Sequence, residues 1–381
     1  MDEIYLDNSA TTRPLPEVTK QVLQVLKQDY GNPSSPHKKG ARAEAYLRRA
    51  RRLLSGQLGV SEKEIYFTSG GTESNNLALR GTAYNYKNRG QHLITSNIEH
   101  PSVYNVFQAL EEEGFSVSYL DVDGKGLVDP FSLKEALTEQ TILVSIMQVN
   151  NELGSLQPIN KLGSIIKNYN RDIFFHVDGV QAFGKIPVRP KEDNIDLLSL
   201  SGHKFHGPKG TGILFFRDSM LIKPLFAGGG QEDHIRSGTE NVPGIAGLIP
   251  ALQALPAFNP QTVNEKLSEL KKYFIKLITE QLPAARINTP SRSAPHIISL
   301  SFRGIKGEVL IHALEEENIY ASTGAACHSR RTDNSRILEA INLPEDYRDG
   351  TIRISLSEFI TRKQLEFTTE KIKEKIDFLQ L

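Results

Sequence analysis

The chain has 381 residues, which is enough for a large hydrophobic core and roughly two domains. Apolar residues make up 39% of the chain and charged residues 24%, as is typical of folded globular proteins. The formal net charge of +0 gives no support to a nucleic-acid or membrane-surface partner. Because no apolar run reaches the length of a membrane span and the first residues do not resemble a signal peptide, we expect a cytoplasmic protein.

The sequence contains one cysteine, Cys327, which excludes an intramolecular disulfide and a multi-cysteine metal site. We expect no metal in this protein. Small residues precede Cys327 and a basic run follows it, and His328, Arg330 and Arg331 would favour the thiolate form of its side chain. A cysteine is more often buried and inert, but this sequence favours a reactive thiol on a loop that reaches solvent.

In chain order, the first predicted elements are a short strand at 4–6 and a helix at 16–28. Val18, Val22, Leu23 and Leu26 recur in that helix at the spacing of one helical face. A turn at 30–36 leads to a second helix that ends near Leu58, and Ser61 is predicted to cap a short segment before a strand.

From there, predicted strands and helices alternate. The strands are at 65–68, 92–96, 116–120, 141–148, 173–177, 195–200 and 211–216. One helix is predicted to start after Gly71, and three more are predicted at 101–113, 130–138 and 159–169. A further helix is predicted to end near Ala254. This alternation predicts an α/β fold with a mostly parallel sheet covered by helices on both faces.

The pattern changes after Pro256–Pro260. A long amphipathic helix at 262–281 precedes strands at 296–302, 319–323 and 351–356 and helices at 307–317, 335–341 and 361–379. This order is typical of an α+β unit. We therefore predict a large domain of residues 14–256 and a small domain of residues 1–13 and 257–381, which carries the loop around Cys327.

Polar residues follow five strands of the predicted sheet. They are Gly71 and Thr72, His100, Asn151, Asp178 and Gln181, and Ser201, His203 and Lys204. Ligands of open α/β sheets bind at the carboxyl ends of the strands, so these residues together predict one binding site. The Gly70–Thr72 stretch opens a helix and suits a phosphate, although a simple glycine-rich turn is an equally good interpretation of it alone.

A lysine at one strand end and an aspartate at the next are the pair that pyridoxal phosphate chemistry requires. Lys204 would bind the cofactor through its amine, and Asp178 would keep the pyridine nitrogen protonated. Arg353 lies in an apolar strand, where its charge needs a partner, and either a substrate carboxylate or solvent would serve. The residues by themselves thus indicate a pyridoxal phosphate enzyme that acts on an amino acid.

Nearly the whole chain resembles the NifS/IscS-like cysteine desulfurases, which belong to class V of the fold-type-I pyridoxal phosphate enzymes. The motifs that carry this resemblance, in chain order, are Tyr5-Leu6-Asp7-Asn8-Ser9-Ala10-Thr11-Thr12, Gly31-Asn32-Pro33-Ser34-Ser35, Thr68-Ser69-Gly70-Gly71-Thr72-Glu73-Ser74-Asn75, Glu99-His100, Asn150-Asn151-Glu152, His176-Val177-Asp178, Ser201-Gly202-His203-Lys204, Arg236-Ser237-Gly238-Thr239-Glu240-Asn241, Cys327 and Arg353. The resemblance implies a large domain built on a seven-stranded, mostly parallel sheet and a smaller α+β domain.

The resemblance also assigns roles. Lys204 holds the cofactor and acts as the proton-transfer base, His100 stacks on the cofactor ring, and Cys327 takes the sulfur of L-cysteine as a persulfide and leaves L-alanine. The implied cofactor ligands are Gly71, Thr72, His100, Asp178, Gln181, Ser201, His203, Lys204 and, from the second subunit of a homodimer, Thr239. The implied ligands of the substrate carboxylate are Asn151 and Arg353.

Two features bear on the protein that accepts the sulfur. The run after Cys327 is basic, and the chain ends at Leu381 soon after its last predicted helix. We therefore expect a dedicated sulfurtransferase, for tRNA thiolation or thiamine synthesis, and an iron–sulfur scaffold is the alternative. A class V aminotransferase, a selenocysteine lyase and a non-enzymatic sulfur carrier are rival functions.

Overall fold

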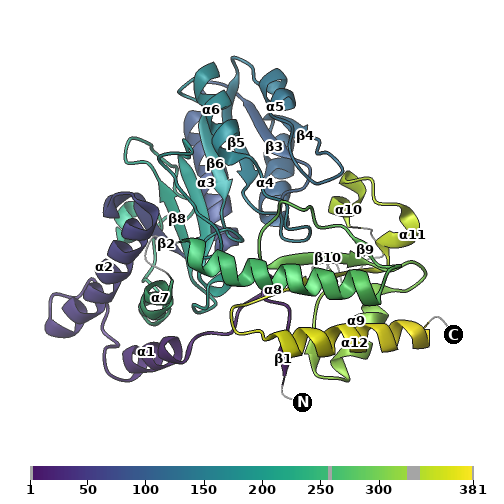
Figure 1. Cartoon of the computed structure of the whole chain (residues 1–381). Coiled ribbons are helices and arrows are strands. Elements are labelled where there is room, and N and C mark those ends of the chain that lie inside the picture. Colours follow the sequence, from purple (N-terminus) through teal and green to yellow (C-terminus); the bar gives the residue numbers. More distant parts are fainter. Residues whose placement is uncertain (1–2, 256–259, 324–334, 380–381) are drawn as a thin grey trace.

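The computed structural model describes residues 3–255, 260–323 and 335–379, and the chain forms two parts that each have their own sheet (Figure 1). The larger part has a seven-stranded sheet. Its strands, in spatial order, are β2 (Ile65–Thr68), β8 (Gly212–Phe216), β7 (Leu197–Ser201), β6 (Phe174–Asp178), β5 (Thr141–Met147), β3 (His92–Ser96) and β4 (Ser116–Leu120). Only β8 runs against its neighbours, so the carboxyl ends of the other strands lie along one edge. The predicted α/β fold with a mostly parallel sheet is confirmed.

Helices cover both faces of this sheet, and all seven residues of the interior strand β5 are buried as a result. On one face, α3 (Gly71–Tyr86) and α4 (Pro101–Glu112) pack in an apolar cluster with Leu93 and Leu143. The cluster on the other face includes side chains of α1 (Pro16–Lys27), α2 (Lys38–Leu58), α5 (Pro130–Ala136), α6 (Ile159–Tyr169) and α7 (Val242–Ala254). Burial from both sides explains why these strands are continuous apolar runs in the sequence.

The smaller part contains a three-stranded antiparallel sheet, in which β10 (Ile297–Ser301) lies between β12 (Thr351–Ser355) and β9 (Arg286–Ile287). A separate parallel pair joins β1 (Ile4–Tyr5) to β11 (Ile319–Tyr320). The helices of this part are α8 (Pro260–Gln281), α9 (Gly307–Glu315), α10 (Arg336–Ala340), α11 (Glu345–Arg348) and α12 (Arg362–Leu379). Its core includes Ile4, Ile298, Leu310 and Ile372, so the N-terminal strand packs with the C-terminal third of the chain.

Several details differ from the sequence-based predictions. The strand β9, the helix α11 and the 3₁₀ turn η3 (Gln231–His234) span two to four residues each, too few to produce a hydrophobic period. Ser61 does cap the 3₁₀ turn η1 (Glu62–Glu64), with Glu64 completing a capping box. The N-cap of α3 is Gly70, so Thr72 lies inside the first helical turn.

The predicted apolar face of α1 was partly wrong. Val18 and Val25 are buried, whereas Leu23 and Leu26 are 47% and 56% exposed. Leu23 lies roughly 140° around the helix from Val18 at 3.6 residues per turn, so the two cannot share one face. Spacing in the sequence identified the helix but not the side of it that meets α7.

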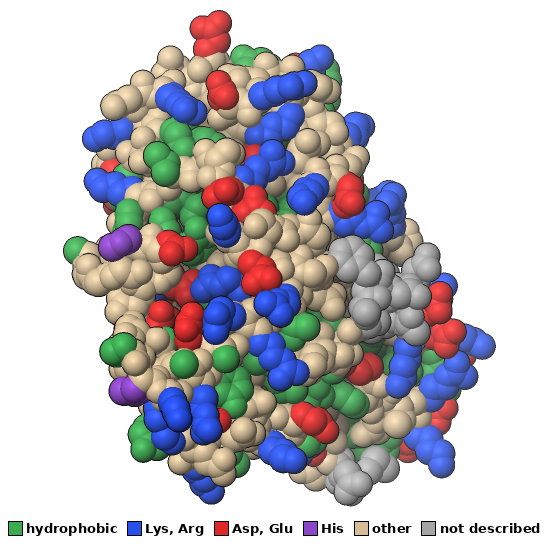
Figure 2. All heavy atoms as spheres, turned by 90° about the vertical axis from the view of Figure 1, so that its left-hand side faces the viewer, with side chains coloured by type: hydrophobic (Ala, Val, Ile, Leu, Met, Phe, Trp, Pro, Cys, Tyr) green, Lys and Arg blue, Asp and Glu red, His purple; other side chains and the backbone are tan. Residues whose placement is uncertain are grey.

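The division into a large domain of residues 14–256 and a small domain of the remaining residues stays a prediction. The pairing of β1 with β11 agrees with it, because it joins the N-terminal residues to the smaller part. Within the described residues, no helix is both long and apolar enough to cross a lipid bilayer. Figure 2 shows the side of the molecule on which α1 and α2 lie, and basic and acidic side chains are interspersed there.

Candidate active site

The polar strand ends meet in one cavity of about 200 Å³ at the carboxyl edge of the large sheet. Nine of the predicted site residues line it, namely Gly71, Thr72, His100, Asn151, Asp178, Gln181, Ser201, His203 and Lys204. The cavity wall also includes Asn75, Ser102, Met147, Val149 and Val180, to which the sequence analysis gave no role. Asn75 could have been found, because it lies one helical turn after Gly71 on the helix that opens at this edge.

One end of the cavity has the features of a phosphate site. The backbone N–H groups at the start of α3 lie there, at the positive end of a helix of 16 residues. A Cβ atom on Gly71 would approach Cγ2 of Val180 to 2.9 Å, so glycine leaves room that a side chain would take. The hydroxyl of Ser201 is buried and has no hydrogen-bond partner among the described residues, which leaves it available to a ligand.

Lys204 lies at the end of the 3₁₀ turn η2 (Gly202–Lys204), directly after β7. Its amine donates hydrogen bonds to the backbone carbonyl of Ser9 and, at 2.8 Å, to that of Ala10. The amide of Gln181 also donates to the Ser9 carbonyl, at 2.9 Å. The N-terminal segment therefore crosses this side of the cavity and contacts two of its predicted cofactor ligands.

Asp178 ends β6 and is 6% exposed. Its Oδ1 accepts a hydrogen bond from the backbone N–H of Val180 at 3.0 Å, and its Oδ2 accepts one from the side-chain amide of Asn75 at 2.9 Å. These donors hold the carboxylate in one orientation at the centre of the strand edge. A fixed carboxylate of this kind suits the protonated ring nitrogen of a pyridine.

Two histidines in the cavity wall are held in the neutral form. Burial lowers the pKa of His203 to about 4, and the positive charges of Lys204 and Lys209 act in the same direction. Burial also lowers the pKa of His100, with Asp178 opposing this shift and Lys204 and Arg336 adding to it. Neutral imidazoles can stack on a flat ring or donate a single N–H without adding charge to the site.

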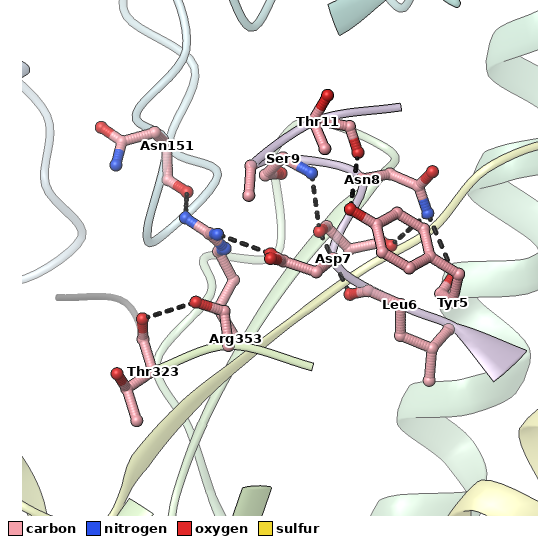
Figure 3. A network of polar contacts seen from close by, with 12 residues as sticks. Tyr5, Leu6, Asp7, Asn8, Ser9, Thr11, Asn151, Thr323 and Arg353 are labelled. Atoms are coloured by element: carbon pink, nitrogen blue, oxygen red, sulfur yellow. Dashed lines mark hydrogen bonds and ion pairs between the residues drawn. The ribbon is translucent and has the colours of Figure 1, made fainter. Parts of the chain in front are cut away.

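Arg353 lies on β12 and is 5% exposed. Figure 3 shows its guanidinium between Asp7 and Asn151, and Asn151 belongs to the cavity wall. One Nη donates to Oδ1 of Asp7 at 2.8 Å, and the other donates to the backbone carbonyl of Asn151 at 3.0 Å. The buried Nε has no partner among the described residues. The solvent-exposed alternative for Arg353 is thus wrong, and its charge is paired with Asp7 in this structure.

Two further predicted residues in the described parts of the chain, Arg353 and Thr239, are not among those that line this cavity. Thr239 lies in the connection between β8 and α7 and does not line the cavity of its own chain. Cys327 falls within 324–334, outside the described residues. In the parts of the chain that the structure describes, no three His, Cys, Asp or Glu side chains are grouped so that they could hold a metal ion.

The residues in the cavity fit pyridoxal phosphate. They combine an amine on Lys204, a fixed carboxylate on Asp178, an imidazole on His100 and a helix N-terminus with a free hydroxyl for the phosphate. Together with the sheet topology, this set defines the class of pyridoxal phosphate-dependent enzymes with an open, mostly parallel α/β sheet.

Comparisons with known proteins narrow this class. The family model for class V aminotransferases matches residues 4–367. The cysteine desulfurase IscS of Dictyoglomus turgidum is 42% identical over 99% of this chain and 95% of its own length. A solved NifS-like protein is 37% identical, with a TM-score of 0.92 over 99% of this chain and all of its own. The structure of SspA in complex with cysteine is 35% identical, with a TM-score of 0.83 over 94% of this chain and all of its own.

The chain therefore belongs to the class V aminotransferase family and, within it, to the pyridoxal phosphate-dependent cysteine desulfurases. The enzyme class, the cofactor and the family expected from the sequence motifs are confirmed. The individual roles of the site residues stay predictions.

Proposed function

We propose that this protein removes the sulfur atom from L-cysteine, releases L-alanine and retains the sulfur as a persulfide on Cys327. The observation that carries the proposal is the meeting of Lys204, Asp178 and His100 in one cavity beside a buried arginine. The names of the relatives and the cysteine bound to the SspA structure support the same substrate.

In this proposal, Asn151 and Arg353 bind the substrate carboxylate, with the unpartnered Nε of Arg353 as an available donor. Bound pyridoxal phosphate supplies an electron-withdrawing ring that stabilises the negative charge left when the α-proton is removed. Lys204 holds the cofactor and, once released, moves that proton. Gly71, Thr72, Ser201 and His203 hold the phosphate, Asp178 faces the ring nitrogen and Gln181 faces the phenolic oxygen.

The sulfur step uses Cys327 as the nucleophile. Its thiolate attacks the substrate sulfur, the carbon–sulfur bond breaks, and a sulfur–sulfur bond forms on the protein. The carbon that loses sulfur takes a proton and becomes the methyl group of L-alanine, so one cysteine and one thiol give one alanine and one persulfide. The neighbouring His328, Arg330 and Arg331 support this role because positive charge favours the thiolate.

We further propose a cytoplasmic homodimer in which Thr239 of each subunit contacts the cofactor phosphate of the other. The position of Thr239 away from the cavity of its own chain supports this arrangement. For the sulfur acceptor we propose a dedicated sulfurtransferase, in tRNA thiolation or thiamine synthesis, because the run after Cys327 is basic. Faster transfer of sulfur to an iron–sulfur scaffold would favour the alternative acceptor.

The test is the intact mass of the purified enzyme after exposure to L-cysteine and blocking of its thiols, for wild type and Cys327→Ala. We expect sulfur to be added to the wild type alone, with alanine released into solution. Turnover of cysteine without sulfur on either protein, and with the cofactor left in its amine form, would contradict the proposal. That result would favour an aminotransferase, and turnover of selenocysteine but not cysteine would favour a selenocysteine lyase.

A further inference from the structure

The proton on the His100 ring has only one possible position when the ring is neutral. His100 is the N-cap of α4, and its Nδ1 accepts a hydrogen bond from the backbone N–H of Ser102 at 3.1 Å. A backbone N–H can only donate, so Nδ1 carries the lone pair and the proton lies on Nε2. The hydroxyl of Ser102 lies 2.8 Å from the same Nδ1 and therefore donates to it as well.

The Ser102 hydroxyl is in turn oriented by a buried amide. Nδ2 of Asn75 donates to Oγ of Ser102 at 2.9 Å and to Oδ2 of Asp178 at 2.9 Å. The reversed amide would place its oxygen against an oxygen of Asp178, whereas the amide nitrogen donates to that oxygen, so the orientation of Asn75 is determined chemically. A chain of three hydrogen bonds with fixed directions thus links Asp178 to the ring of His100.

The opposite side of the His100 ring carries Nε2. His100 lines the cavity, and the hydrogen bonds that its side chain makes with described residues are those of Nδ1. With Nδ1 directed at the start of α4, Nε2–H is directed away from the helix. At this position His100 therefore presents a hydrogen-bond donor, Nε2–H, and not an acceptor.

We propose that Asn75 and Ser102 are positioning residues that fix His100 as an N–H donor to a substrate oxygen or sulfur. His100 then has no free nitrogen with which to accept the α-proton, and that role falls to Lys204. This inference rests on the proposed function and deepens it, because it divides the acid and base roles between two side chains.

The charges around His100 agree with a neutral ring. The charged groups that face it are Asp178 on β6, Lys204 after β7 and Arg336 on α10. Burial is the largest influence on its pKa and lowers it, Asp178 opposes, and Lys204 and Arg336 lower it further. Protonation of Nδ1 would also set two N–H groups against each other and remove the cap of α4.

The test is nuclear magnetic resonance of the holoenzyme labelled with ¹⁵N at histidine, with long-range proton–nitrogen spectra at several pH values. The signals of His100 are assigned by their absence in His100→Gln, since the chain has 10 histidines. We expect Nε2 to be protonated and Nδ1 to be free at neutral pH. A proton on Nδ1, or a doubly protonated ring, would overturn the proposal whether or not the enzyme uses L-cysteine.

A matched pair of variants tests the positioning role. Ser102→Ala removes one donor to Nδ1, so we expect the titration of His100 to move up by roughly half to one pH unit. Ser102→Thr keeps the hydroxyl and should return the titration to the wild-type value. An unchanged titration in Ser102→Ala would overturn the role of Ser102. The proposed desulfurase function is tested separately by the persulfide measurement on Cys327, so failure of one proposal can be told from failure of the other.

Discussion

Glu99, directly before His100, offers a sharp test of how burial controls charge beside the active site. Its side chain is 0% exposed. Oε1 accepts hydrogen bonds from the hydroxyl of Ser96 at 2.6 Å and from the backbone N–H of Met147 at 3.0 Å. Oε2 is buried without a partner among the described residues, which suits a protonated oxygen. Burial raises the pKa of Glu99 to about 8, so this acid is neutral in the folded protein at physiological pH.

The sign of the pH dependence follows from this raised pKa. In the unfolded chain Glu99 releases its proton near its ordinary value of 4.5, whereas the folded protein keeps the proton up to about pH 8. Between those values the folded state binds more protons, and stability falls by about 1.4 kcal/mol for each pH unit. Below pH 4.5 Glu99 is protonated in both states and its ionisation does not change the free energy of unfolding. Above about pH 8 it is ionised in both states, and the free energy of unfolding falls no further.

The variant Glu99→Gln removes this dependence because an amide is neutral at every pH and its oxygen can accept both hydrogen bonds. We expect the variant to gain roughly 3 kcal/mol over wild type between about pH 5.5 and about pH 7.5. The measurement is urea unfolding of both proteins at each pH, with Glu112→Gln on the exposed side of α4 as the control for loss of one carboxylate. A difference between Glu99→Gln and wild type that does not change with pH would refute the reasoning.

Two further variants test the contacts of the site. Asp7→Asn removes the charge that pairs with the buried Arg353 but keeps an acceptor, so we expect a loss of about 1–3 kcal/mol in urea unfolding. Adding Arg353→Met should recover part of it, and strictly additive effects would argue against the pair. In Gly71→Ala the new Cβ lies 2.9 Å from Val180 Cγ2, so the cofactor affinity should fall by about 5- to 100-fold. Absorbance titration measures it, and an unchanged affinity would mean that the phosphate binds elsewhere.

The sequence allowed much of the site to be predicted because its residues follow strands. Asp178 and Lys204 come directly after apolar runs, and parallel strands bring such positions to one edge of a sheet. Asn75 and Ser102 were missed for the opposite reason. They lie near the starts of helices, where polar residues are common as caps and solvent contacts, so their types did not mark them. Only the position of Asn75, one turn after Gly71, pointed to this edge.

Some contacts could not be predicted from the sequence at all. Asp7 and Arg353 are 346 residues apart in the chain, and no local pattern connects them. The helix α1 likewise has two exposed leucines, Leu23 and Leu26, because only its side with Val18 and Val25 is covered by the rest of the fold. Both outcomes depend on which surfaces meet, and a period in the sequence carries no information about the partner surface.

By itself, the sequence determined the order of strands and helices, the residues at each strand end and the family to which the chain belongs. These properties depend on local chemistry, since apolar periodicity sets the elements and turn residues set their ends. The tertiary structure alone decided the charge and proton positions at the site. Burial keeps Glu99 protonated, and hydrogen bonds from Asn75 and Ser102 orient the ring of His100. The free energy of a charge depends on the atoms around it, and folding brings those atoms together from distant segments.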